Sequence, residues 1–75
     1  MKSVNVMLGT INDVKEFVSI VTKYDYDIDL ISGRYAVDAK SIMGIFSLDL
    51  SKPIRLDIHA AEAPQLLDEI KKFQV

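Results

Sequence analysis

Apolar residues change their spacing between the first two predicted elements of the chain. From Ser3 to Leu8 they alternate with polar residues, a pattern typical of a strand with one buried face. From Thr10 onward they recur every third or fourth position, which predicts a helix with one apolar face. The residues expected on that face are Ile11, Val14, Phe17, Val18 and Val21. Thr10 is expected to cap this helix, with Asp13 in the position of the acidic member of a capping box.

The next residues predict a β-hairpin. Residues 26–30 alternate between apolar and acidic side chains, and residues 34–38 form a second alternating run that directs Tyr35 and Val37 to one side. Between the two runs, Ser32-Gly33 can turn the chain because glycine adopts a positive φ at no steric cost. We therefore expect two antiparallel strands here.

A short helix, a fourth strand and a final helix are predicted after the hairpin. Ser41 precedes an apolar run, residues 42–48, that is long enough for one or two helical turns. Residues 54–58 alternate again, directly after Pro53, and predict a strand. Pro64 is expected at the start of the last helix, where its missing N–H costs nothing. The apolar residues of this helix are Leu66, Leu67, Ile70 and Phe73.

The predicted order of elements is β-α-β-β-α-β-α, in a single domain that spans residues 1–75. Each predicted strand has one apolar face, and two of the strands form a hairpin. We therefore predict an α/β protein of the α+β type, an open-faced sandwich in which three helices cover one face of a four-stranded antiparallel sheet. Ferredoxin-like modules that bind small ligands are an alternative, because similar orders of elements serve unrelated functions.

Composition excludes several classes of function. The net charge of −2 gives no basic surface for nucleic acid or for an anionic membrane. The sequence has no cysteine, which excludes disulfides, thiolate metal sites and cysteine nucleophiles. No apolar stretch approaches the length of about 20 residues that spans a bilayer. We expect a cytoplasmic protein.

The chain offers little chemistry outside its helix termini. His59 is the only histidine and should lie on the open face of the sheet, on the same side as Asp57. Asp27 or Asp29 is expected nearby, and Asp25, Asp27 and Asp29 alternate along one face of their strand. One histidine with scattered carboxylates lacks the spacing of a metal site, so we predict neither a metal nor a cofactor. We interpret the acidic run as a solvated face, with Arg34 and Arg55 as its possible cross-strand partners.

The run Ala39-Lys40-Ser41-Ile42-Met43-Gly44-Ile45-Phe46-Ser47-Leu48 closely resembles a segment of the HPr proteins of low-GC Gram-positive bacteria. In that family, the histidine phosphocarriers of the sugar phosphotransferase system, this segment carries a regulatory serine and opens the second helix. Ser32-Gly33-Arg34 then falls on the family's hairpin turn, and Phe17-Val18 falls on a Phe-Val pair of its first helix. The resemblance extends over essentially the whole chain.

The same alignment places residues 9–13 on the family's active-site run, Gly-Leu-His-Thr-Arg-Pro. Thr10 then stands at the phosphoacceptor histidine, Asn12 at the arginine and Asp13 at the proline. The resemblance therefore implies that the nucleophile and the cation have both been lost, and that Thr10 remains as a helix cap.

The resemblance also implies a regulatory site and a docking surface. Ser41 corresponds to the regulatory serine, so it is expected both to cap a helix and to be a site of phosphorylation. Ile42, Met43 and Phe46 occupy the positions of the family's apolar docking surface.

These expectations lead to a hypothesis about function. The chain is predicted to be a non-catalytic HPr-like regulator, not an enzyme, similar to catabolite-repression HPr. Its expected partners are other proteins, such as the HPr serine kinase or a transcriptional regulator. One alternative is a phosphoryl-transfer component that uses another residue, and another is the ferredoxin-like module. A sheet order of 1-4-2-3 favours the HPr fold, and 4-1-3-2 favours the ferredoxin-like one.

Overall fold

The structure is a computed structural model that describes all residues from Met1 to Val75. Its single sheet has the order β1-β4-β2-β3, with every neighbouring pair of strands antiparallel. The strands are β1 (Lys2–Val6), β2 (Ile28–Ser32), β3 (Tyr35–Asp38) and β4 (Ile54–Ile58). This order confirms the HPr-type open-faced sandwich and excludes the ferredoxin-like alternative.

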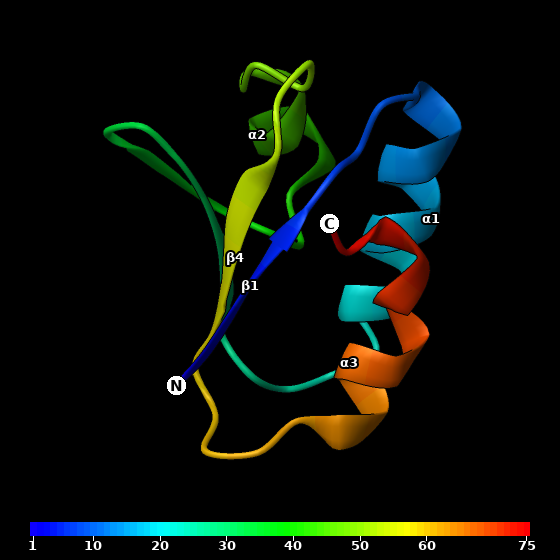
Figure 1. The fold of residues 1–75 in the computed structure, drawn as a ribbon, viewed down its shortest axis with the longest axis vertical. Helices are drawn as coiled ribbons and strands as arrows, with labels where there is room; N and C mark the ends of the chain where they lie inside the picture. Colours follow the sequence, from blue (N-terminus) through cyan, green and yellow to red (C-terminus); the bar gives the residue numbers. More distant parts are fainter.

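Three helices pack on the sheet. They are α1 (Ile11–Val21), α2 (Ile42–Phe46) and α3 (Pro64–Glu69), and a 3₁₀ turn (Lys71–Phe73) follows α3. Figure 1 shows α1 and α3 beside each other against the sheet, while α2 and the first turn of α1 lie at the same end of the molecule. No helix has both the length and the apolar character needed to cross a membrane.

One cluster of sixteen buried apolar side chains lies between the sheet and the helices. The central strand β4 contributes Ile54, Leu56 and Ile58, and α1 contributes Val14, Phe17 and Val21. The other members are Val6, Leu8, Ile28, Leu30, Ala39, Ile45, Ala63, Leu66, Ile70 and Phe73. The alternation predicted for β4 and the helical spacing predicted for α1 are thus confirmed.

The structure corrects the expectation for Ile11, which was placed on the buried face of α1. Its side chain is 63% exposed. Ile11 is the first residue of the helix, and Figure 1 shows this first turn extending beyond the end of β1. Tyr35, expected to point with Val37, is also exposed, because it begins β3 directly after the turn.

Two element boundaries also differ from the expectation. The hairpin turns at Gly33-Arg34 and not at Ser32-Gly33, because Ser32 still pairs with Tyr35. Gly33 supplies the required positive φ of 61°. The last helix ends at Glu69, because the chain beyond it runs back along β1. Met7 N–H donates to the carbonyl of Phe73 (2.8 Å), and Val75 N–H donates to that of Asn5 (3.1 Å).

Candidate partner-binding site

The N-terminus of α1 is capped as the sequence predicts. The Thr10 hydroxyl accepts a hydrogen bond from the Asp13 backbone N–H (3.0 Å), which satisfies one of the free donors of the first turn. The carboxylate of Asp13 makes no return bond to the backbone of Thr10, so only half of a capping box is present. Thr10, Ile11 and Asn12 are all exposed. This helix terminus carries one acidic side chain and no cation in its first turn.

The N-terminus of α2 has the same type of cap. The Ser41 hydroxyl accepts from the Gly44 backbone N–H (3.2 Å), and Ser41 is exposed. Gly44 is closely packed, since a β-carbon there would lie 3.3 Å from the Ser41 hydroxyl oxygen and 3.4 Å from the β-carbon of Val37. The short helix is thus held against β3 by a residue that lacks a side chain.

Two of the three side chains predicted for the docking surface are available to a partner. Met43 is 78% exposed and Phe46 is 40% exposed, whereas Ile45 between them is fully buried. Ile42 is half-buried and packs against the core, so it contributes less surface than expected. The exposed Ile11 lies at the same end of the molecule. We call Ile11, Met43 and Phe46 the docking patch.

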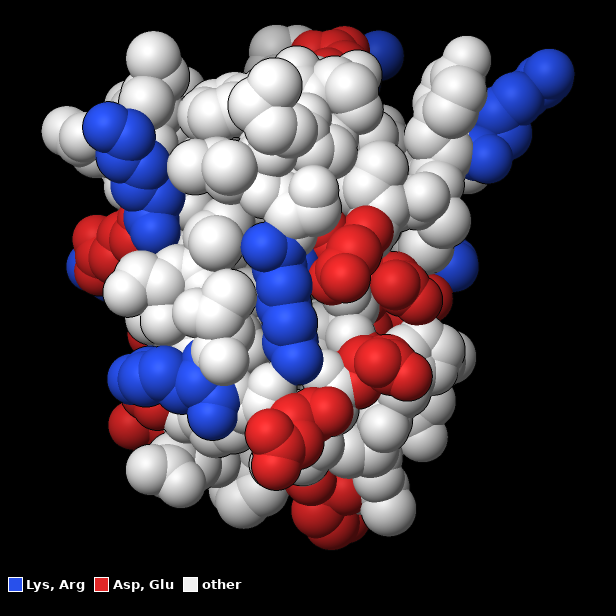
Figure 2. All heavy atoms as spheres, turned by 180° about the vertical axis from the view of Figure 1, so that it is seen from behind, with Lys and Arg blue, Asp and Glu red and all other residues white.

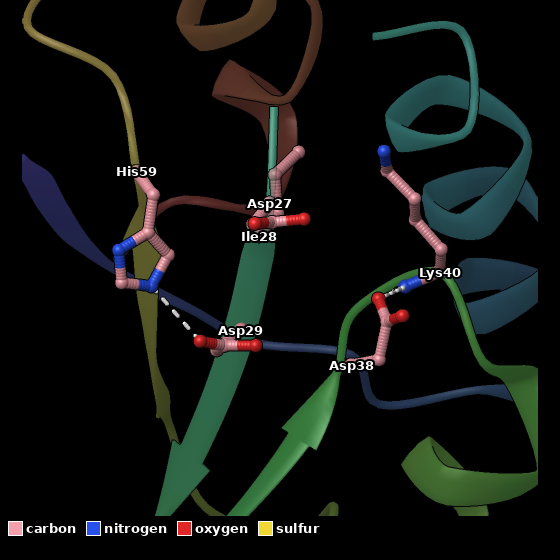
Figure 3. A pocket seen from close by; sticks show the side chains of 6 residues that line it. All are labelled: Asp27, Ile28, Asp29, Asp38, Lys40 and His59. Atoms are coloured by element: carbon pink, nitrogen blue, oxygen red, sulfur yellow. Dashed lines mark hydrogen bonds and ion pairs between the residues drawn. The ribbon is translucent and has the colours of Figure 1, made fainter. Parts of the chain in front are cut away.

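A hollow near the start of β2 is dominated by carboxylates. We call it the acidic hollow; it is lined by Asp27, Ile28, Asp29, Asp38, Lys40 and His59. Figure 3 shows His59 bonded to Asp29 on the adjacent strand, with 2.9 Å between Nε2 and the carboxylate oxygen. The Lys40 ammonium donates to the Tyr24 carbonyl (2.6 Å). No group of three side chains here or elsewhere is arranged to hold a metal ion.

Charge is distributed unevenly over the surface. On the side of the molecule seen in Figure 2, many acidic side chains gather in one group that runs from the centre to the bottom, with others at the top and left edges, whereas the basic side chains are scattered. The strand register explains part of this, because Asp29 of β2 lies opposite Asp38 of β3 on one side and Asp57 of β4 on the other. Three carboxylates thus stand in a row across the sheet.

Asp57 is the only charged residue that is buried, with 6% of its surface exposed. It accepts from the Ser3 hydroxyl (2.8 Å) and pairs with Arg55, whose Nε lies 3.1 Å from its carboxylate. The expectation that Arg34 and Arg55 pair with the acidic run of β2 was therefore wrong. Arg55 is occupied by Asp57, and Arg34 at the hairpin tip makes no ion pair. The sequence carried no direct signal for this, since Ser3 and Asp57 meet only through the β1–β4 register.

Tyr24 and Glu69 fasten the end of α1 to α3. The Tyr24 hydroxyl donates to the Glu69 carboxylate, which also pairs with Lys23 (2.6 Å). The hydrogen bond to Glu69, together with desolvation, raises the pKa of Tyr24 to about 12. Lys23 and then the Tyr24 hydroxyl lower the pKa of Glu69. Tyr24 also stacks on Tyr26, with ring centroids 5.7 Å apart, so both tyrosines pack beside the end of α1.

The sheet order and the covering helices define the class of protein as an open-faced sandwich of the phosphocarrier type. Residues 12–74 match the family model described as the PTS HPr component phosphorylation site. The chain therefore belongs to the HPr family, whose members are phosphocarriers of the sugar phosphotransferase system. No curated protein matches the sequence.

Solved structures of HPr proteins share this fold. HPr-C-His from Thermoanaerobacter tengcongensis is 24% identical with a TM-score of 0.79, covering 96% of this chain and 89% of that one. The histidine-containing phosphocarrier protein of Mycoplasma is 15% identical, with a TM-score of 0.75 and coverages of 95% and 89%. The phosphocarrier protein HPr from Bacillus anthracis is 27% identical, with a TM-score of 0.72 and coverages of 97% and 94%.

The family match begins at Asn12, so Gly9, Thr10 and Ile11 lie outside it. His59, the only histidine of the chain, lies in the acidic hollow and not at a helix N-terminus.

Proposed function

We propose that this chain is a non-catalytic, regulatory member of the HPr family that acts by binding another protein through the docking patch. The observation that carries the proposal is the exposure of Met43, Phe46 and Ile11 at one end of a small domain. Single exposed apolar residues are ordinary, but three large ones at one end are typical of a partner surface. Methionine adapts to differently shaped partners because its side chain is flexible and polarizable.

The proposed loss of phosphocarrier chemistry rests on the N-terminus of α1. Free N–H groups and the positive end of a helix dipole favour a phosphoryl group there. Thr10 offers only a hydroxyl, and a phosphothreonine ester lacks the group-transfer potential of a phosphorylated imidazole. Asn12 supplies no charge, and Asp13 in the first turn repels an anion. These residues support binding as the function and argue against carriage of phosphoryl groups.

Ser41 is proposed as the site of regulation. Its hydroxyl is exposed, and it stands two residues before Met43, so a phosphate there would change the charge beside the docking patch. A phosphoserine carries a charge of about −1.5 to −2. The expected partners are therefore a serine kinase of the HPr type and a protein, such as a transcriptional regulator, that distinguishes the two charge states.

Substitution of Met43 by Glu tests the docking patch. Because Met43 is largely exposed, Met43→Glu should leave the thermal midpoint nearly unchanged while abolishing capture of the partner from an extract of the native cell. Ser19→Glu is the matched control, because it adds the same charge at an exposed position on α1 and should retain capture. Unfolding of Met43→Glu would show that Met43 is a core residue and would refute the docking patch.

A further inference from the structure

A second groove lies next to the docking patch and differs from the acidic hollow in its charge. It separates the β2–β3 hairpin from the segment between α2 and β4, two parts of the chain that diverge at the end of the sheet in Figure 1. The groove is about 710 Å³ in volume, and half-buried Ile31 and Leu48 are among the residues that line it. Tyr35, 67% exposed, stands at its edge. We call it the hairpin groove.

Positive charge in the hairpin groove is available to a partner. Arg34 makes no ion pair or hydrogen bond within the chain. Lys52 makes one loose contact of 3.9 Å, with Asp49, and both of these side chains are more than half exposed. The groove thus has two cations and one carboxylate among its lining residues, whereas the acidic hollow has three carboxylates, one lysine and His59.

The single carboxylate of the groove is already occupied by its own loop. Asp49 accepts from both the hydroxyl (2.6 Å) and the backbone N–H (3.0 Å) of Ser51. These two bonds lower the pKa of Asp49, so it stays ionised and remains held by the loop. The guanidinium of Arg34 has no such internal partner, which leaves it free to form a bidentate pair with an external carboxylate.

The hairpin groove and the docking patch are linked by consecutive residues of the chain. Ser47, which lines the groove, directly follows Phe46 of the patch. A protein seated on Phe46 and Met43 would therefore reach the mouth of the groove. The docking patch would supply apolar contacts and the hairpin groove would supply charge to the same partner.

We propose that the hairpin groove receives an extended acidic segment of the partner protein, an inference that rests on the proposed docking function. A carboxylate of that segment pairs with Arg34 and Lys52. An apolar side chain next to that carboxylate packs on Ile31 and Leu48 beside the Tyr35 ring. Charge complementarity steers this encounter and selects against basic partners, which the acidic hollow would otherwise favour.

The test uses the ¹⁵N-labelled protein and two synthetic peptides. One peptide alternates Asp or Glu with Leu, and the matched one replaces every Asp and Glu by Asn and Gln. The acidic peptide should shift the amide signals of residues 33–35 and 47–52, and raised salt should weaken its binding. The neutral peptide should bind much more weakly.

Charge variants assign the interaction to the two cations. The double variant Arg34→Gln/Lys52→Gln should weaken binding of the acidic peptide about tenfold, the expected effect of losing two surface ion pairs. Lys15→Gln/Lys71→Gln removes the same charge at exposed positions outside the groove and should change the affinity less than about twofold. Because all four side chains are exposed, each variant should keep a dispersed amide spectrum.

Three results would overturn the proposal: equal binding of the neutral peptide, peptide shifts confined to residues 43–46, or the same groove shifts produced by inorganic phosphate alone. The outcomes also separate the two proposals. If Met43→Glu loses the partner while the acidic peptide does not bind, the docking patch stands and the groove proposal fails. If Met43→Glu retains the partner while the groove binds the peptide, the docking patch fails and the groove proposal stands.

Discussion

The N-termini of α1 and α2 have the same backbone chemistry and different surroundings. Each is capped by a hydroxyl that accepts from the N–H of the third helical residue, at 3.0 Å for Thr10 and 3.2 Å for Ser41. That third residue is Asp13 in α1 and Gly44 in α2. An acidic side chain therefore stands in the first turn of one helix, and none stands in the first turn of the other.

A helix cap and a site that binds an anion have different requirements. A capped helix start requires only a hydroxyl and free N–H groups, and both helices retain them. Binding of an anion is favoured further when no negative charge occupies the first turn and a cation is near. The start of α1 lacks both conditions, since Asp13 is present and the position after Ile11 is Asn12. The start of α2 has no acidic residue in its first turn, and the ammonium of the preceding Lys40 is bonded to the Tyr24 carbonyl.

The largest expected contrast is in phosphoryl transfer at α1. Incubation with labelled phosphoenolpyruvate and enzyme I of the sugar system should leave this chain unlabelled, because neither Thr10 nor Asn12 can replace the histidine and the arginine. The double variant Thr10→His/Asn12→Arg should gain acid-labile label, because it places an imidazole and a cation at a helix start that keeps its free N–H groups. Acid-labile phosphate on His59 of the unsubstituted chain would contradict this prediction.

At α2 the comparison predicts the opposite result. The serine kinase that modifies Gram-positive HPr, with ATP, should phosphorylate this chain at one residue, and Ser41→Ala should prevent it. The physical reason is that Ser41 is exposed and its helix start has no acidic side chain to repel the added charge. Mass spectrometry of the folded protein measures the result. Phosphorylation of Thr10 and not of Ser41 would contradict the predicted difference between the two helix starts.

Both caps could be predicted from the sequence because capping depends on local spacing alone. Thr10 and Ser41 each precede an apolar helical run, and the structure confirms both caps. The strand order could also be predicted, because the segment of residues 39–48 indicated the family and the family implies the order. These features depend on short-range pattern or on resemblance, so no long-range contact had to be inferred.

The features that were missed depend on contacts between residues far apart in the chain. Burial of Asp57 requires the β1–β4 register that brings Ser3 opposite it, 54 residues away. Exposure of Ile11 depends on where the sheet ends, which helical periodicity does not reveal. The hairpin groove exists only because two loops diverge, and loop paths leave no periodic signal in the sequence.

Removal of the two caps should have effects of moderate and unequal size. Thr10→Ala and Ser41→Ala should each lower the free energy of unfolding by about 1 kcal/mol, which corresponds to a fall of about 4–8 °C in the thermal midpoint of a domain this small. We expect Thr10→Ala to have the larger effect, because α1 has eleven residues and three buried side chains and α2 has five residues and one.

Thr10→Ser and Ser41→Thr are the matched controls, since each keeps a hydroxyl at the cap and should stay within about 0.5 kcal/mol of the unsubstituted protein. Calorimetry of all four variants makes the measurement. A loss at Ser41→Ala that exceeds the loss at Thr10→Ala would mean that α2, despite its length, contributes more to the folded state than α1.

The smallest expected effect concerns Asp13 itself. A negative charge in the first turn stabilises a helix by about 0.3–1 kcal/mol at low ionic strength, so Asp13→Asn should reduce stability by an amount in that range. The hydrogen bond from its backbone N–H to Thr10 is unaffected by the substitution, which isolates the charge from the cap. High salt should therefore remove most of the difference between the two proteins. If the difference in unfolding free energy persists in high salt, the Asp13 carboxylate acts through a specific contact. Its proposed role as a repulsive charge at the start of α1 would then have to be abandoned.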